Sequence, residues 1–172
     1  KKNQKLFANL GKLPRVDVLL SKKDLKKKEV LKPLKPFFCK KCFLVQHPIY
    51  TDPKDIFKDD YIYYSSTVKS WVEHCKIFVH KNIKRFSLTK NSFVVEVASN
   101  DGYLLQQFVK KKIPCLGIEP SSGVINEAKK KGVETLNEFY NYKSAKKIAK
   151  NYSKADLIVA NNVLAHIPNL KE

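Results

Sequence analysis

The stretch Phe93-Val-Val-Glu-Val-Ala-Ser-Asn-Asp-Gly-Tyr103 decides how the second half of the chain is expected to fold. Its first six residues, Phe93 to Ala98, form a short β-branched run that is typical of a buried strand. Ser99 to Gly102 then predicts a tight turn. From Tyr103 to Lys112 apolar residues lie on one face at helical spacing. The stretch therefore predicts a strand, a turn and a helix in succession.

Strands and helices continue to alternate after this stretch. The apolar patterns predict three further strands and two further helices, at 114–118, 133–136, 156–160, 121–131 and 141–151. Ser121 and Ser122 are candidate caps of the first of these helices, and Gly132 is placed just after its end. Such alternation predicts an α/β fold with a parallel sheet, in which the last strand lies beside the first. Since the sequence contains only four such strands, we expect a Rossmann-like domain that is incomplete, in a fragment of a longer protein.

The first part of the chain follows another pattern. Residues 1–50 are irregular and rich in lysine and proline, and Leu34 to Val45 predicts a hairpin that carries Cys39 and Cys42. A close cysteine pair in a cytoplasmic chain points to metal rather than to a disulfide. From Thr67 to about Arg85 the pattern predicts one amphipathic helix. We therefore expect a small zinc-binding-type domain that includes a tyrosine-rich segment, a connecting helix and the Rossmann-like domain, at 1–66, 67–90 and 91–172.

Composition and charge limit the function classes. The chain has 172 residues, of which 43% are hydrophobic, as in a globular protein. It contains no apolar run of membrane-spanning length and no signal peptide at its start, so we expect a cytoplasmic protein without a membrane partner. The net charge of +18 suggests nucleic-acid binding. However, Arg15 and Arg85 are the only arginines, and the lysines are spread along the chain. Nucleic acid is therefore not the expected partner.

Ligands of doubly wound sheets lie at the carboxyl ends of the strands. Ser99, Asn100 and Asp101 offer polar groups there, and Gly102 allows the backbone to approach a ligand closely. Asp101 is also a plausible N-cap of the following helix, so two interpretations of it stay open. Other residues expected at this edge are Ala98, Pro120, Asn161 and Asn162.

Glu119 is the most informative single position, because it lies 20 residues after Ser99, at the end of the second strand. An acidic side chain there accepts hydrogen bonds from the two hydroxyl groups of a ribose. The alternative is a surface glutamate ahead of Pro120. A ribose-binding role requires Glu119 to lie beside the bend Asn100–Gly102, on the same rim of the sheet.

The charge of the turn favours S-adenosylmethionine over a dinucleotide. Dinucleotide sites use several glycines to bring the backbone close to a pyrophosphate, whereas this turn has only Gly102 and carries Asp101. A carboxylate would repel pyrophosphate but suits a ligand with an ammonium and a sulfonium. Glu96, inside the first strand, is a second acidic group that could orient the loop or water around the amino-acid part of the cofactor.

Five motifs, in order, carry a family resemblance: Cys39-Lys-Lys-Cys-Phe-Leu-Val-Gln46, Tyr61-Ile-Tyr-Tyr-Ser-Ser66 followed by Ser70-Trp-Val-Glu-His74, Glu96-Val-Ala-Ser-Asn-Asp-Gly-Tyr-Leu-Leu105, Gly117-Ile-Glu-Pro120 and Ala160-Asn-Asn-Val-Leu-Ala-His166. Together they resemble the sugar C-methyltransferases that build branched deoxysugars. The resemblance implies a zinc domain, a class I methyltransferase domain that binds S-adenosylmethionine, and a C-terminal domain. It also implies methylation of carbon 3 of a nucleotide-linked 4-keto-deoxysugar, through removal of a proton beside the ketone.

The resemblance also implies roles for particular residues. A tyrosine among Tyr61, Tyr63 and Tyr64 would lie at the substrate and handle a proton, although these rings could instead be core packing. The family's zinc site uses four cysteines, and Cys39 and Cys42 supply two, so we expect a half-present site. The family's catalytic histidine and glutamate lie beyond the cofactor domain, so we expect this chain to bind cofactor but not to turn over.

Two rival functions share some of these features. A class I methyltransferase with another small-molecule substrate would use the same cofactor residues but would need neither the tyrosine segment nor the cysteine pair. A zinc-knuckle module for nucleic acid would use the lysine-rich first half, and its binding would depend steeply on salt.

Overall fold

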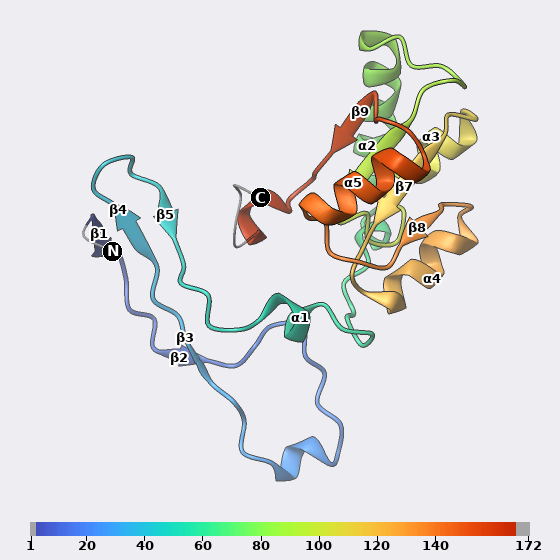
Figure 1. Cartoon of the computed structure of the whole chain (residues 1–172). Coiled ribbons are helices and arrows are strands. Elements are labelled where there is room, and N and C mark those ends of the chain that lie inside the picture. Colours follow the sequence, from blue (N-terminus) through green and yellow to red (C-terminus); the bar gives the residue numbers. More distant parts are fainter. Residues whose placement is uncertain (1–2, 168–172) are drawn as a thin grey trace. The chain divides into compact units, whose positions relative to one another are not determined.

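The computed structural model describes residues 3–167 and divides the chain into two compact units, Lys1–Ile56 and Phe57–Glu172 (Figure 1). The sequence suggested a first region that ended at residue 66. Compactness instead groups residues 57–66 with the sheet-containing unit, because the backbone of Tyr63, Ser65 and Ser66 is hydrogen-bonded to side chains of the turn after the first strand of the sheet.

The first unit consists of short strands and turns. Strand β4 (Phe37–Cys39) pairs antiparallel with β5 (Val45–Gln46), which confirms the expected hairpin around the cysteine pair. The sequence did not predict β1 (Gln4–Leu6), which pairs with the other edge of β4. It also missed the two-residue pair of β2 and β3 and two short helices; these elements are β2 (Lys12–Leu13), β3 (Lys32–Pro33), η1 (Asp24–Lys26) and α1 (Pro53–Ile56).

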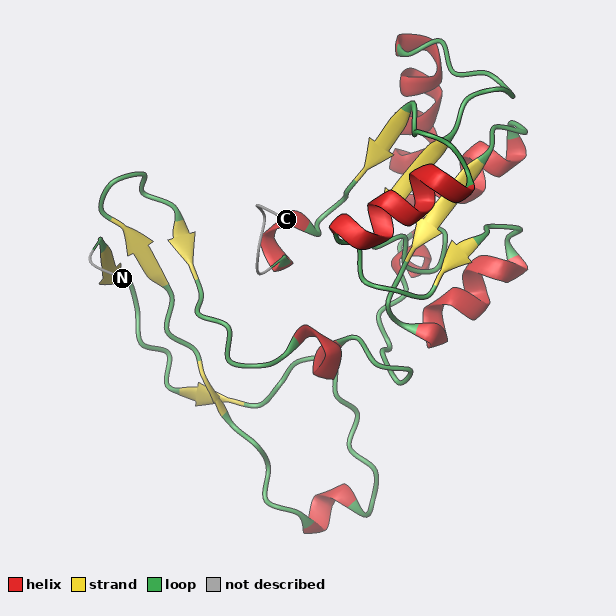
Figure 2. Cartoon of the chain, in the orientation of Figure 1, coloured by secondary structure: helices red, strands yellow, loops and turns green. Residues whose placement is uncertain are grey.

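The second unit is built on a parallel sheet, which Figure 2 shows in yellow. Its strands are β6 (Val94–Val97), β7 (Cys115–Ile118), β8 (Thr135–Leu136) and β9 (Leu157–Val159). They lie in the order β8-β7-β6-β9, and every neighbouring pair is parallel. The expected placement of the fourth strand beside the first is therefore confirmed, and each strand is one or two residues shorter than its pattern suggested.

Helices connect these strands and precede them. They are η2 (Ser65–Thr67), α2 (Lys69–Arg85), α3 (Leu105–Lys110), α4 (Ser122–Lys130), α5 (Tyr142–Asn151) and η3 (Leu164–His166). Asn141 caps α5 through a reciprocal capping box with Ser144. Gly132 follows the C-cap of α4 at φ 75°, as expected, because this position needs a left-handed backbone. No described helix is long and apolar enough to cross a bilayer.

Two apolar clusters cover the two faces of the sheet. One gathers side chains from α2, α3 and α4 around Val94, and the other joins α5 to Val95 through Ile148. Successive residues of a strand point to opposite faces, so neighbours Val94 and Val95 belong to different clusters. The chain runs from β6 outward to β8 and then returns to place β9 on the other side of β6. Ligands of doubly wound sheets bind beside such a reversal, so the carboxyl end of β6 is where a site is expected.

Candidate functional site

The loop after β6 has an unusual backbone. Ala98, Asn100 and Gly102 all have positive φ, at 55°, 50° and 72°, and Asn162 after β9 has φ 52°. Left-handed backbone costs a residue with a side chain about 1–2 kcal/mol. Such strain at the carboxyl end of β6 marks a loop that the surrounding structure holds in one shape.

Gly102 serves packing at this loop. A Cβ at this position would lie 3.0 Å from Val133 Cγ2 and 3.2 Å from Ala128 Cβ. The space that a side chain at Gly102 would need is therefore filled by Ala128 of α4 and by Val133, which precedes β8. The absence of a side chain at Gly102 thus serves packing inside the unit, and the expected close approach of the loop backbone to a ligand stays a prediction.

Glu119 lies beside the loop, as the sequence argument required. Its side chain is 3% exposed, so the alternative of a surface glutamate is wrong. One carboxylate oxygen accepts a hydrogen bond from the N–H of Asn100 and the other from the N–H of Ser121, both at 3.0 Å. Burial raises the pKa of this carboxyl, and the two N–H donors oppose the rise. Asn137 fixes the same turn by donating to the carbonyls of Glu119 and Pro120.

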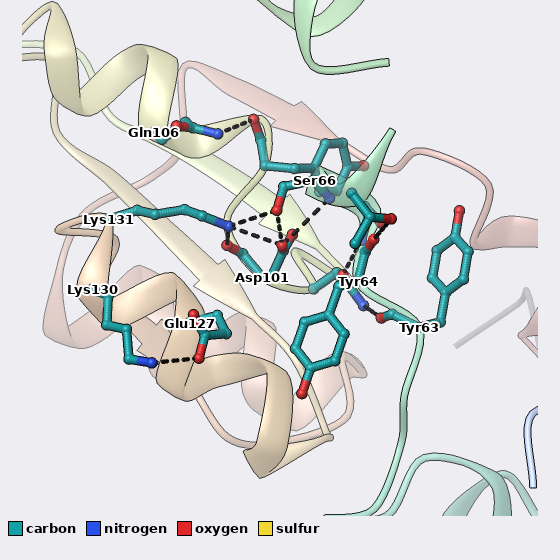
Figure 3. Close-up of polar contacts among 12 residues, drawn as sticks. Tyr63, Tyr64, Ser66, Asp101, Gln106, Glu127, Lys130 and Lys131 are labelled. Carbon is teal, nitrogen blue, oxygen red and sulfur yellow. Dashed lines mark hydrogen bonds and ion pairs between the residues drawn. The ribbon is translucent and has the colours of Figure 1, made fainter. Parts of the chain in front are cut away.

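Two residues of the loop bind the tyrosine segment: Asp101 contacts Ser66, as Figure 3 shows, and Asn100 contacts the backbone of the segment. The side chain of Asn100 accepts from the N–H of Ser65 at 2.9 Å and donates to the carbonyl of Tyr63 at 3.0 Å. Asp101 Oδ2 accepts from both the N–H and the hydroxyl of Ser66. The polar side chains that the sequence assigned to a cofactor thus hold residues 63–66 against the loop.

Asp101 does not cap a helix. The N-cap of α3 is Leu104, and no side chain bonds to the first turn of that helix. The carboxylate of Asp101 instead forms an ion pair with Lys131, with 2.8 Å between Oδ2 and Nζ. The negative charge that favoured a cationic ligand in the sequence argument is therefore balanced by a lysine.

Sequence reasoning did not single out Lys131, which is the last residue of a run of three lysines at 129–131. The signal was its register: Val124 and Ala128 lie on the buried face of α4, and residue 131 continues that face at helical spacing. Lys131 contacts Asp101 twice, at the carboxylate and at the carbonyl, and contacts the hydroxyl of Ser66 at 3.1 Å.

Glu96 is a buried acid with an unusual environment. It is fully buried, and neither carboxylate oxygen has a hydrogen-bond partner among the described residues. Burial raises its pKa well above the ordinary value, while the nearby hydroxyl of Tyr103 opposes this shift. The same hydroxyl accepts from the side chain of Asn161 at 3.3 Å, which places Asn161, from the end of β9, near the end of β6. Sequence reasoning did not single out Tyr103.

Ser99 and Asn162 differ from the other loop residues. Ser99 is buried, and its side chain points at Gly117, where a Cβ would lie 2.3 Å from the serine hydroxyl oxygen. Its side chain therefore faces the neighbouring strand. Asn162 is exposed at the carboxyl end of β9. Ala98 and Pro120 are partly exposed next to the buried residues of the site.

The three tyrosines differ in their surroundings. Tyr61 packs edge-on against Phe57 with 5.3 Å between ring centroids, and its ring lies 6.5 Å from that of Tyr63. Tyr63 is 52% exposed, whereas Tyr61 and Tyr64 are partly buried. Packing thus accounts for Tyr61 within this unit, and the ring of Tyr63 is the most accessible of the three.

The segment before the tyrosines covers the start of α4. The hydroxyl of Ser121 donates to the carbonyl of Lys58 at 2.6 Å, and the hydroxyl of Ser122 donates to the carboxylate of Asp59. Ser121 is the N-cap residue of α4 by position, but neither hydroxyl bonds to the helix, so the expected side-chain cap is wrong. A carboxylate from Asp59 lies at this helix N-terminus instead, where it suits the helix dipole.

Cys39 and Cys42 lie in the turn of the β4–β5 hairpin. The backbone N–H groups of Cys42 and Lys41 lower the pKa of the Cys39 thiol, which favours the thiolate form that binds metal. Both are free cysteines. Within residues 3–167 no group of three or more histidine, cysteine, aspartate or glutamate side chains could hold a metal ion. The described residues therefore offer two zinc ligands and do not close a tetrahedral site.

Comparisons with known proteins agree with the resemblance seen in the motifs. Residues 1–57 match the family model described as "Putative zinc binding domain". The chain is 29% identical over 164 residues to C-methyltransferase NovU of Streptomyces niveus. The alignment covers 95% of this chain and 39% of that relative, so the chain spans about two fifths of the relative's length.

Proposed function

We propose that the second unit binds S-adenosylmethionine in a Rossmann-like, class I methyltransferase fold, and that the chain takes part in C-methylation of a nucleotide-linked keto-deoxysugar. Similarity to a C-methyltransferase over nearly the whole chain supports the reaction class. The sheet order with its reversal beside β6 supports the fold. The proposed sugar substrate rests on the resemblance of the five motifs to sugar C-methyltransferases. Four free cysteines suit the reducing cytoplasm expected for the protein.

The observation that carries this proposal is the position of Glu119. Its carboxylate is fixed by the N–H groups of Asn100 and Ser121, one on each side, at the carboxyl edge of β6 and β7. Each oxygen keeps a lone pair beyond the hydrogen bond it accepts. A ribose with two adjacent hydroxyl groups matches this arrangement, because each hydroxyl can donate to one oxygen.

Glu96 would serve the other end of the cofactor. Its carboxylate lacks partners among the described residues, and burying such a group without a partner is costly. A cationic ammonium group at the carboxyl end of β6 would supply the missing charge. Asn161 donates to the hydroxyl of Tyr103, and this contact would hold the end of β9 in place beside the site. When bound, the cofactor supplies an electrophilic methyl group.

The tyrosine segment would serve the sugar. The ketone of the proposed substrate acidifies the neighbouring carbon, so the reaction needs proton transfer and close positioning. Asn100 and Asp101 hold residues 63–66 beside the loop that follows β6. Tyr63, which is the most exposed of the three tyrosines, is our first choice for a ring that contacts substrate, with Tyr64 next. Zinc enters no step, because the described residues do not close its site.

Isothermal titration of the full chain with S-adenosylmethionine tests the proposal. Glu119→Gln removes the charge but keeps the shape, and we expect affinity to fall about tenfold or more, since hydrogen bonds to a charged group contribute about 1.5–3 kcal/mol. The matched control is Glu127→Gln, which changes an acid on α4 whose partner is the exposed Lys130.

Equal binding by Glu119→Gln and the wild-type chain, with both folded by circular dichroism, would refute the ribose assignment. Tighter binding of NAD than of S-adenosylmethionine would refute the cofactor. A steep fall of RNA or DNA binding with salt, without any binding of S-adenosylmethionine, would favour the nucleic-acid alternative.

A further inference from the structure

Lys130 and Lys131 are neighbours in sequence with opposite surroundings (Figure 3). Lys130 pairs with Glu127 on the surface of α4, and its side chain is 70% exposed. Lys131 is 24% exposed, and it pairs with Asp101, which is 1% exposed. The two lysines thus form a matched pair, in which only the second contacts the loop after β6.

Three groups meet at the ammonium of Lys131. It lies 2.8 Å from Asp101 Oδ2, 2.6 Å from the carbonyl of the same residue and 3.1 Å from Ser66 Oγ. Ser66 in turn donates its hydroxyl and its N–H to the same carboxylate oxygen. One lysine therefore contacts the loop and the tyrosine segment at once.

The network depends on the lysine for charge balance. Asp101 Oδ1 is buried without a hydrogen-bond partner among the described residues, so the carboxylate is stabilised through Oδ2 and the nearby ammonium. Removal of one partner of a buried pair leaves an uncompensated charge, which is more damaging than loss of a surface pair. A carboxylate left alone would draw in water, which would weaken its hold on Ser66.

We propose that Lys131 is a positioning residue, which docks the segment Tyr63–Ser66 on the loop Ser99–Gly102 by binding Asp101 and Ser66 together. The inference rests on the proposed function for its chemical meaning, because the segment carries the tyrosines assigned to the sugar and the loop borders the proposed cofactor site. Asn100 anchors the segment at Tyr63 and Ser65. Lys131 and Asp101 anchor its other end, so Tyr64 lies between two fixed points.

Hydrogen exchange of the Ser65 and Ser66 amides, measured by NMR on the full chain without cofactor, tests the inference. The Ser66 N–H bonds to Asp101 and the Ser65 N–H bonds to Asn100, so each amide reports one anchor. In Lys131→Met we expect Ser66 to exchange about tenfold faster or more, with a smaller change at Ser65. Lys131→Arg, which keeps the charge, should restore most of the protection.

Lys130→Met is the control, and it should leave both amides within about twofold of wild type. Fluorescence of Trp71, the single tryptophan of the chain, checks that each variant is folded. Should Lys131→Met lose its fold, Ser66→Ala removes only the hydroxyl contact and should still speed exchange at position 66.

Two results would overturn the inference: unchanged Ser66 exchange in a folded Lys131→Met chain, or an equal effect of Lys130→Met. These outcomes are separate from failure of the proposed function. Absence of S-adenosylmethionine binding by the wild-type chain would refute that function, whereas the exchange experiment needs no cofactor.

Discussion

The two units of this chain contrast in what they bury. Residues 3–56 contain no buried side chain, and large apolar residues such as Phe7, Val16 and Phe43 are more than 60% exposed. Described residues from Phe57 onward contain two apolar clusters, in which Leu104 and Phe108 are completely buried. Apolar residues are thus present in both units but gather into a core only in the second.

The difference shows what makes a core in this molecule. A parallel sheet has two faces, and helices supply the apolar stripes that cover them. The two- and three-residue strands of the first unit offer no such face. Small units of this kind usually need a metal or another partner for stability, and the match to a zinc-binding domain model lies in this unit.

The largest expected effect concerns the cysteines, which lie two in each unit. Cys42 is exposed and Cys39 has a lowered pKa, while burial raises the pKa of Cys75 to about 11 and that of Cys115 to about 12. We expect iodoacetamide at neutral pH to modify the first pair about a thousandfold faster than Cys75, because a buried thiol reacts only after opening. Cys115 is partly buried, and its raised pKa should also make it react more slowly than the first pair. Mass spectrometry of timed digests measures the four rates. Comparable rates at all four would mean that the second unit lacks a stable core.

The next largest effect should come from replacing one phenylalanine in each unit by alanine and comparing the loss of stability. Phe108→Ala empties a completely buried site, and we expect the free energy of unfolding of the second unit to fall by about 3–5 kcal/mol. Phe43→Ala in the first unit, at 75% exposure, should change it by less than about 0.5 kcal/mol. Urea unfolding followed by Trp71 fluorescence gives both values. A large effect of Phe43→Ala would show that the units are not energetically separate.

The stability of the second unit should depend on pH through the titration of Glu96. Because burial raises its pKa above the ordinary 4.5, the folded state holds this proton to higher pH than the unfolded chain does. Stability should therefore fall as pH rises from about 4.5 toward the raised value. Glu96→Gln removes this titration, so we expect equal stability near pH 4 and a gain of about 1 kcal/mol or more at pH 8. Urea midpoints at the two values test this, and a variant that is less stable at pH 8 would contradict it.

The smallest expected effect is at the surface of α4. Lys130→Met removes an exposed pair with Glu127 and should change stability by less than about 0.5 kcal/mol. The same urea titration measures it. A larger loss of stability would mean that exposed ion pairs, and not only the two apolar clusters, stabilise the second unit.

Sequence patterns predicted most of the second unit because its residues follow simple periods. The β-branched run at Phe93 to Ala98 and the amphipathic helix before Arg85 are local signals, and both elements are present. The patterns missed β1, because its residues, Gln4–Leu6, carry no alternation and pair with β4 more than thirty residues away. A pattern read over a few neighbouring residues cannot reveal a strand pairing between residues so far apart in sequence.

For the site, the sequence indicated which residues would meet but not what they would bind. The expected closeness of Glu119 to the loop follows from parallel topology, which any sheet of this order imposes. The partners of Asp101 could not be predicted, since Ser66 and Lys131 lie 35 and 30 residues away and meet it only in three dimensions. The cofactor roles of the loop residues stay predictions.

Glu119 and the loop beside it are the proposed site for S-adenosylmethionine. The most direct measurement is an amide NMR titration of the full chain with this cofactor. We expect saturable shifts at Asn100 and Ser121, whose N–H groups bond to Glu119, and no shifts in residues 3–56. Shifts confined to the first unit, or none at Asn100 and Ser121 in a folded chain, would contradict it.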